Sequence, residues 1–268
     1  MTMFQDLIIV SSLTIIIHMI DTFSYSVRLA GVRTRRLALA LSLFNILVLI
    51  SRTSNMVQGP LAGGFVDYGA QTGDLGWVET RFRLIILSAT IGSFLGALLI
   101  PTFIRIFSKA IVKLELYGSI PHLLRRTLTI GKIRRLGKEF SPPRVNIHRF
   151  RIAGVPKRLI ILQIAITAIY TVGVLAAMFA SLLVPEHATR AVMSSGIING
   201  IATILFTVFV DPQVALLTDE VIHDKKSYLN ISNMVGVLIM GKIVGTLIGQ
   251  LIFIPSAKII AYFTIFIS

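Results

Sequence analysis

The chain has 268 residues, of which 54% are apolar and only 14% are charged, and its formal net charge is +14. Because soluble domains carry about 25% charged residues, this composition excludes a soluble globular protein and indicates an integral membrane protein. The absence of cysteine excludes disulfides, thiolate metal sites and thiol nucleophiles. The N-terminus carries Asp6 in place of a basic region and lacks a small-residue cleavage site, which favours a retained first helix over a cleaved signal peptide.

Six apolar segments are long enough to cross the ~30 Å hydrocarbon core of a bilayer as helices. They lie near residues 5–27, 37–57, 84–104, 159–184, 190–210 and 234–254. Their continuous apolar runs, which lack an alternation of period two, exclude a β-barrel. We therefore predict an all-α, polytopic membrane protein with six transmembrane helices.

The second half of the chain is faintly similar to the first, at an offset of about 153 residues. Gly92 and Gly96 of the third span correspond to Gly245 and Gly249 of the sixth, and other short landmarks recur at similar offsets. Three spans in each half cross in opposite senses, which is the inverted-repeat arrangement of many transporters, with the binding site between the halves. The alternative is a chance alignment of apolar sequence. The predicted parts are a first three-helix repeat at 1–104, a basic cytoplasmic linker at 105–158, and a second three-helix repeat with a short C-terminal segment at 159–268.

The repeat leads to two further predictions. Small-residue ridges such as Gly241, Gly245 and Gly249 allow close helix packing, and we expect the third and sixth helices to lie beside each other. The connections at 58–83 and 211–233 are predicted symmetry mates on opposite sides of the membrane. They are either opposed gates or ordinary loops.

Positively charged residues set the orientation of membrane proteins. The connection after the first span includes Arg28 and Arg33, and the linker holds fourteen Lys and Arg residues against two Glu residues. We therefore place both connections in the cytoplasm and both termini outside. The linker either acts only as a topology signal or attracts anionic membrane lipids through residues 118–140. Its near lack of aromatic residues argues against nucleic acid as a partner.

Three charged residues fall inside the predicted spans, namely Asp21, Arg52 and Lys242. A charge at the centre of a membrane helix costs about 2.5–3.5 kcal/mol, so these side chains are expected to face protein or water. We expect Asp21 and Lys242 to be partners, either at a functional site or as an ion pair that fixes helix register. Arg52 is expected nearer the outer end of its span, where it either binds a ligand or extends toward the surface.

Arg52 belongs to a polar stripe with Ser51 and Asn55, and Asn45 lies two turns earlier on the same predicted helix. A guanidinium group suits bidentate recognition of phosphate oxygens, so a lipid phosphate or diphosphate is the predicted ligand. The alternative is that these polar side chains only hold helices together, as is common in membrane bundles.

His18 and Asp21 are three residues apart and share a helix face. They form either a protonatable pair for ion coupling or a structural contact between helices. A metal site would need a further ligand, and the other histidines fall in predicted loops. With no P-loop or nucleophile motif in the sequence, we predict neither a metal nor a cofactor.

Three stretches of the sequence carry a family resemblance: His18–Thr34, Ser51–Asn55 and Asp211–Asp219. Together with the six spans and the basic central loop, they resemble the Amj-type lipid II flippases of bacteria, the family named as the alternate to MurJ. The resemblance implies translocation of lipid II, the undecaprenyl-diphosphate-linked peptidoglycan precursor, from the inner to the outer leaflet of the cytoplasmic membrane. It implies a transporter rather than an enzyme and supplies no catalytic residues.

The residues expected to serve this function fall into two groups. The expected substrate-binding residues are Arg28, Arg33, Asn45, Arg52, Asn55 and Lys242, and the expected charge partners or ion-coupling residues are His18, Asp21 and Asp219.

Two alternative functions use the same sequence features. One is a membrane enzyme that modifies an isoprenoid or phospholipid through His18 and Asp21. The other is a membrane scaffold that binds an anionic partner through the linker. Because lipid II is large for a six-helix bundle, we expect either a cavity that opens laterally to lipid or a homodimer.

Overall fold

The computed structural model describes residues 3–127, 140–141 and 154–267, and every regular element within them is a helix. Six helices are long and apolar enough to cross a membrane. They are α1 (Met3–Thr34), α2 (Leu37–Thr72), α3 (Leu75–Tyr117), α6 (Lys157–Leu183), α7 (Ala188–Leu205) with its continuation α8 (Asp211–Ile222), and α9 (Tyr228–Phe266). The predictions of an all-α membrane protein and of six spans are confirmed.

The helices extend well beyond the apolar segments that predict them. With 36 residues, α2 is about 54 Å long, far more than the ~30 Å hydrocarbon core requires. Helix α2 ends at Gly73, whose φ of 73° is left-handed, and Asp74 caps α3 by accepting a hydrogen bond from the Trp77 backbone N–H at 2.9 Å. The predicted connection at 58–83 was therefore wrong, because polarity marks where hydrocarbon ends and not where a helix ends.

The connection predicted at 211–233 was wrong for the same reason. Helix α7 passes through a π-helical turn, Phe206–Val210, directly into α8, and α9 begins at Tyr228. Helix α3 likewise continues to Tyr117, so the first part of the predicted linker at 105–158 is an extension of a span. A short helix, α4 (Ile120–Thr127), follows it, and most of the remaining linker lies outside the described residues.

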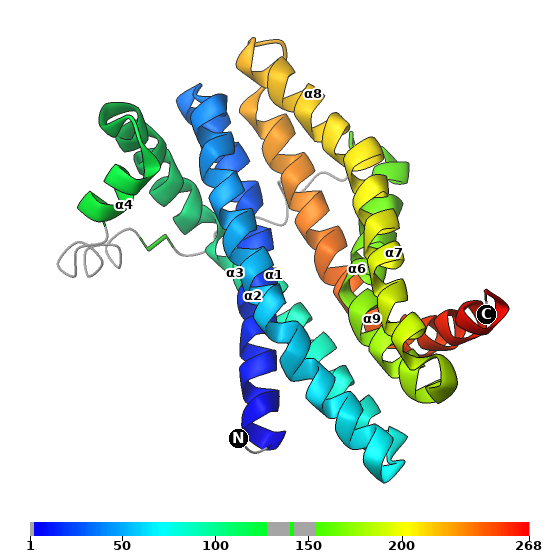
Figure 1. The fold of residues 1–268 in the computed structure, drawn as a ribbon. Helices are drawn as coiled ribbons and strands as arrows, with labels where there is room; N and C mark the ends of the chain where they lie inside the picture. The colour runs from blue at the N-terminus through cyan, green and yellow to red at the C-terminus, as the bar shows by residue number, and fades with distance from the viewer. Residues whose placement is uncertain (1–2, 128–139, 142–153, 268) are drawn as a thin grey trace.

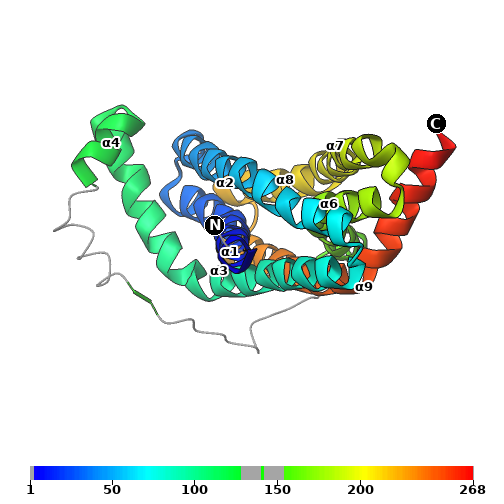
Figure 2. The ribbon, with the colours of Figure 1, turned by 60° about the horizontal axis from the view of Figure 1, so that its bottom comes forward.

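The chain forms two halves that lie side by side (Figure 1). Helices α1–α3 make the first half and α6–α9 the second, and both ends of the chain lie toward the lower end of the molecule in this view. In each half the first helix packs against the second and, most extensively, against the last. Figure 2 shows three layers, with α3 and α9 along one face, α2 and α7 along the other, and α1 and α6 between them.

Glycines allow the closest helix approaches in both halves. A Cβ atom added to Gly96 of α3 would lie 2.7 Å from the Thr22 Cβ of α1, and one added to Gly245 of α9 would lie 2.7 Å from the Ile164 carbonyl oxygen of α6. The ridges thus face the first helix of their own half, and they give no support to a homodimer. The predicted contact between α3 and α9 is present: a Cβ atom added to Gly249 would lie 3.6 Å from the Ile86 Cγ2 of α3, and Phe82 and Phe253 form an edge-to-face pair.

We predict that Gly245→Ala lowers the thermal unfolding temperature of the purified protein in detergent. Overpacking of this kind costs about 1–3 kcal/mol, because the added methyl group meets backbone that cannot move aside easily. Gly63→Ala is the matched control: nothing lies within 4 Å of the added Cβ, and alanine is the better helix former. Equal unfolding temperatures for the two variants would contradict the role assigned to the glycine ridge.

Candidate functional site

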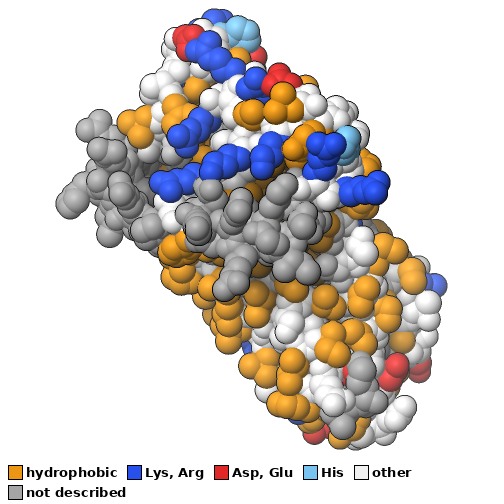
Figure 3. All heavy atoms as spheres, turned by 90° about the vertical axis from the view of Figure 1, so that its left-hand side faces the viewer, with side chains coloured by type: hydrophobic (Ala, Val, Ile, Leu, Met, Phe, Trp, Pro, Cys, Tyr) orange, Lys and Arg blue, Asp and Glu red, His pale blue; other side chains and the backbone are white. Residues whose placement is uncertain are grey.

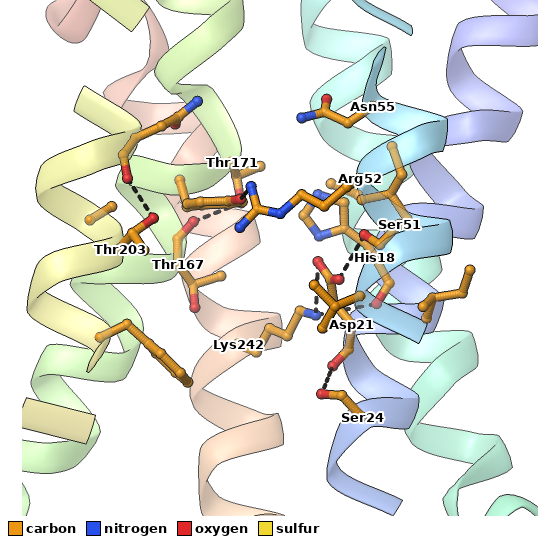
Figure 4. Close-up of a pocket in the computed structure, with 18 of the residues that line it drawn as sticks. His18, Asp21, Ser24, Ser51, Arg52, Asn55, Thr167, Thr171, Thr203 and Lys242 are labelled. Atoms are coloured by element: carbon orange, nitrogen blue, oxygen red, sulfur yellow. Dashed lines mark hydrogen bonds and ion pairs between the residues drawn. The ribbon is translucent and has the colours of Figure 1, made fainter. Parts of the chain in front are cut away.

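A cavity of about 310 Å³ lies between the two halves of the bundle. All six spans contribute to its lining, including residues of the π-helical turn and α8. Figure 4 shows that charged and polar side chains from α1, α2, α6 and α9 converge on it. Because such groups are expensive in hydrocarbon, their gathering around one cavity marks it as the candidate functional site.

One face of α1 forms a polar stripe along the cavity. Thr14, His18, Asp21, Tyr25 and Arg28 all line it, at successive spacings of four, three, four and three residues. This spacing keeps the side chains on one helix face. The stripe extends for about 21 Å at 1.5 Å per residue, which is most of the hydrocarbon thickness. The spacing is visible in the sequence, although the sequence analysis used only three of its members.

The predicted partners Asp21 and Lys242 meet in the middle of this stripe. The Lys242 Nζ lies 4.0 Å from the Asp21 Oδ2 and donates a hydrogen bond to the His18 carbonyl oxygen at 3.2 Å. The Ser51 hydroxyl of α2 donates to the Asp21 Oδ1 at 2.9 Å. The Lys242 side chain is only 8% exposed and that of Asp21 is 35% exposed. A deeply buried cation is thus neutralised by a carboxylate that also faces the cavity.

Arg52 lies near the middle of α2, not toward its outer end as predicted, because α2 continues to Thr72. Its guanidinium points into the cavity, where its Nη1 donates to the Tyr170 hydroxyl at 3.0 Å (Figure 4). Within the described part of the chain, no carboxylate forms an ion pair with Arg52. Since the side chain is also exposed, Arg52 is a cation available to a ligand.

The end of the cavity nearest the α1–α2 connection is lined by Arg28 and Asp211. The Arg28 Nη2 donates to the Asp211 Oδ1 at 2.7 Å, which joins α1 to α8 across the two halves. Sequence analysis placed Asp211 in a family-like stretch without assigning it a role. It also missed Gln163 and Asn199, each of which lines the cavity and has a buried side-chain oxygen without a partner in the described structure. Such orphaned acceptors are suited to a bound ligand or water.

Three predicted site residues lie outside the cavity. Asp219 is exposed on α8 and lies beside His223 at 3.3 Å, and Arg33 is exposed near the end of α1. Asn45 is also exposed. Although Asn45 points in nearly the same direction from α2 as Arg52, its short amide does not reach the cavity, whereas the long arginine side chain does.

The remaining predicted residues do meet at the cavity. Arg28, Lys242 and Arg52 offer cations at successive positions, and carboxylates neutralise the first two. Asn55 lies beside Arg52 as a neutral hydrogen-bonding group. Among the described residues, no group of three or more His, Asp or Glu side chains is placed to share a metal ion. The arrangement is suited to binding an anion and to holding it at more than one depth.

A six-span protein whose two three-helix halves enclose a cavity lined by several cations has the architecture of a membrane transporter. The chain belongs to the family described as Amj, alternate to MurJ, whose model matches residues 13–264. It is similar to a protein of Bacillus subtilis (strain 168) named lipid II flippase Amj, with 41% identity over 252 residues that cover 93% of each chain. No solved structure matches it.

We predict that Asp21→Ala destabilises the protein more than the double variant Asp21→Ala/Lys242→Met. Removing one partner of a fully buried ion pair costs about 3–5 kcal/mol because the other charge stays buried. The partial exposure of Asp21 makes a smaller loss the expectation here. Thermal unfolding of the single and double variants in detergent checks this. A double variant as unstable as Asp21→Ala would show that the carboxylate does not serve to neutralise Lys242.

Proposed function

We propose that this protein is a lipid II flippase, which moves the undecaprenyl-diphosphate-linked disaccharide-peptide from the inner to the outer leaflet of the cytoplasmic membrane. The observation that carries the proposal is the cationic cavity between the halves, in a chain that belongs to the Amj family. The name of its Bacillus subtilis relative supports the choice of substrate. Guanidinium and ammonium groups are the natural partners of a diphosphate.

The polar stripe of α1 supports a path for the headgroup. A diphosphate that enters beside Arg28 meets Lys242 about two helical turns deeper and then Arg52. Asp21 neutralises Lys242 when no cargo is bound and, with His18, is the proposed site of ion coupling. The polyprenyl tail stays in lipid throughout. Alternating access follows if the two halves are inverted repeats that rock against each other around this site.

The size of the cavity constrains this mechanism. At about 310 Å³ it lies at the lower end of the range of about 300–1,000 Å³ that is usual for small-molecule sites. It is suited to a diphosphate but not to a complete disaccharide-peptide, so transport requires the halves to separate. The least buried spans are α2 and the span that contains α7, which border the cavity from opposite halves. We propose that the cavity opens to lipid between them.

Anionic lipids are a second proposed partner. Arg105, Lys109 and Lys113 are exposed and lie four residues apart along α3, so they form one basic stripe. Figure 3 shows a band of Lys and Arg side chains across the upper part of this face, above a largely hydrophobic region. Each such residue near an anionic membrane surface contributes about 1 kcal/mol of attraction. The stripe favours placing this end of the bundle in the cytoplasm, with both termini outside.

We predict that a single cysteine at Glu186→Cys, in the α6–α7 connection, reacts with a membrane-impermeant maleimide in intact cells. A cysteine at Ser119→Cys, between α3 and α4, should react only after permeabilisation. The natural chain has no cysteine, so background labelling is absent. The reverse pattern would overturn the proposed orientation.

We predict that Arg52→Ala and Lys242→Ala each lower lipid II exchange at least about tenfold, since each removes a charge-assisted contact of about 1.5–3 kcal/mol. The measurement is loss of protection of fluorescent lipid II from an impermeant quencher in liposomes that contain the pure protein. Arg190→Ala, at an exposed position near the start of α7, is the matched control and should leave the rate unchanged.

Normal rates for both cavity variants would contradict the proposed path. Exchange of neither lipid II nor a phospholipid by the unaltered protein would favour the scaffold or the enzyme. A covalently changed lipid recovered from the liposomes would identify the enzyme.

A further inference from the structure

The two ends of the cavity differ in that an ion pair joins the halves at the basic end. Toward the termini lies a packed apolar core, in which Phe253 contacts Phe82 and Phe179 with ring centroids 6.1 Å and 5.6 Å apart. At the basic end the halves also share an apolar core, which includes Leu29 and Val214, but here the contacts between the halves include the Arg28–Asp211 ion pair, with side chains 21% and 43% exposed. An apolar core opens only by exposing its surface, whereas an ion pair opens by exchanging one partner for another. The basic end is therefore the end that an anion can open.

Asp211 lies where the regular α-helical hydrogen bonding of its helix is interrupted. It follows the π-helical turn Phe206–Val210, and Pro212 comes directly after it. Proline lacks a backbone N–H and clashes with the carbonyl four residues earlier, so the wider turn accommodates it. Helix α8 can tilt about such a turn with little loss of helical hydrogen bonding. Release of the Asp211 carboxylate thus removes a polar contact between α8 and α1, next to a turn at which α8 can tilt.

We propose that Asp211 is a built-in counter-ion that selects cargo by charge. It occupies the first anion-binding position of the cavity, beside Arg28, and only a cargo that displaces it enters. The inference rests on the proposed flippase function and deepens it, because it names the residue that sets substrate class. A lipid with two phosphate charges is the class that passes.

Charge comparison gives the physical reason. A phospholipid headgroup with a single phosphate offers Arg28 one negative charge, which only replaces the one that Asp211 already supplies. A diphosphate fills the same position and carries a second charge, which Lys242 and Arg52 attract from deeper in the cavity. Asp211 therefore disfavours binding of a lipid with a single phosphate more than binding of a diphosphate lipid. Discrimination of this kind works by repulsion as well as attraction.

A second ion pair at the same end supplies the matched control. Arg35 donates to Asp224 at 2.7 Å and also joins the two halves, but it lies outside the cavity and its side chains are 65% and 72% exposed. Exposed pairs of this kind contribute little to stability. Asp224 has a positive φ of 58°, which asparagine also tolerates. Asp224→Asn thus removes an equivalent charge at no backbone penalty.

The first test measures selectivity. Liposomes that contain the full chain, Asp211→Asn or Asp224→Asn are assayed for exchange of fluorescent lipid II and of fluorescent phosphatidylglycerol. We expect Asp211→Asn to raise phosphatidylglycerol exchange at least about fivefold while lipid II exchange persists, and Asp224→Asn to match the unaltered protein. An unchanged ratio of the two rates in Asp211→Asn would overturn the inference and leave the proposed function standing.

The second test measures, without transport, whether the ion pair limits access to the cavity from the basic end. Ser24→Cys places a thiol on the cavity wall of the otherwise cysteine-free chain, and its maleimide labelling rate is measured in detergent. We expect Asp211→Asn to increase the labelling rate of Ser24→Cys. The charge swap Arg28→Asp/Asp211→Arg, which restores an ion pair, should return the rate to that of Ser24→Cys alone. Equal rates with and without Asp211→Asn would overturn the closure. Failure of the unaltered protein to exchange lipid II would instead overturn the proposed function and the cargo class with it.

Discussion

The helix contacts at the centre of this molecule depend on the neutralisation of one buried charge, that of Lys242. Lys242 is almost completely buried within a span, and its neutralisation requires Asp21 on α1, the His18 carbonyl oxygen, and Ser51 to hold the carboxylate. Together with Lys242 on α9, these groups come from three helices and from both halves. One buried cation thus fixes the lateral position of α1, α2 and α9 at the same depth. The cavity that they enclose has a largely apolar lining, in which these charged groups are concentrated.

Close helix packing within each half leaves the contact between halves comparatively open. Glycines draw α3 onto α1 and α9 onto α6, which makes two tightly packed units. Between the units lies the cavity, whose largely apolar lining includes the charged side chains of Arg28, Arg52 and Lys242. Movement of one unit against the other, as alternating access requires, separates the apolar cores that the two units share at both ends of the cavity.

The three cations that line the cavity differ in how they are paired. Arg52 contacts only a tyrosine hydroxyl among the described polar groups, Lys242 is held by a partly exposed carboxylate, and Arg28 is paired across the halves. A diphosphate moving along this series would exchange one partner for the next rather than face bare hydrocarbon.

The sequence by itself determined the membrane class, the six spans and the buried charges, because hydropathy and helical periodicity are local properties of the chain. The polar stripe of α1 was also there to be found in its four-three spacing. The pairing of Asp21 with Lys242 and the contact between α3 and α9 were also predicted from the sequence, but only the tertiary structure decided the other contacts between the halves. It placed Asp211 beside Arg28 across 183 residues, turned the glycine ridges inward to α1 and α6, and brought Gln163 and Asn199 to the cavity. Such pairings depend on how distant helices pack, and no local pattern in the chain encodes that.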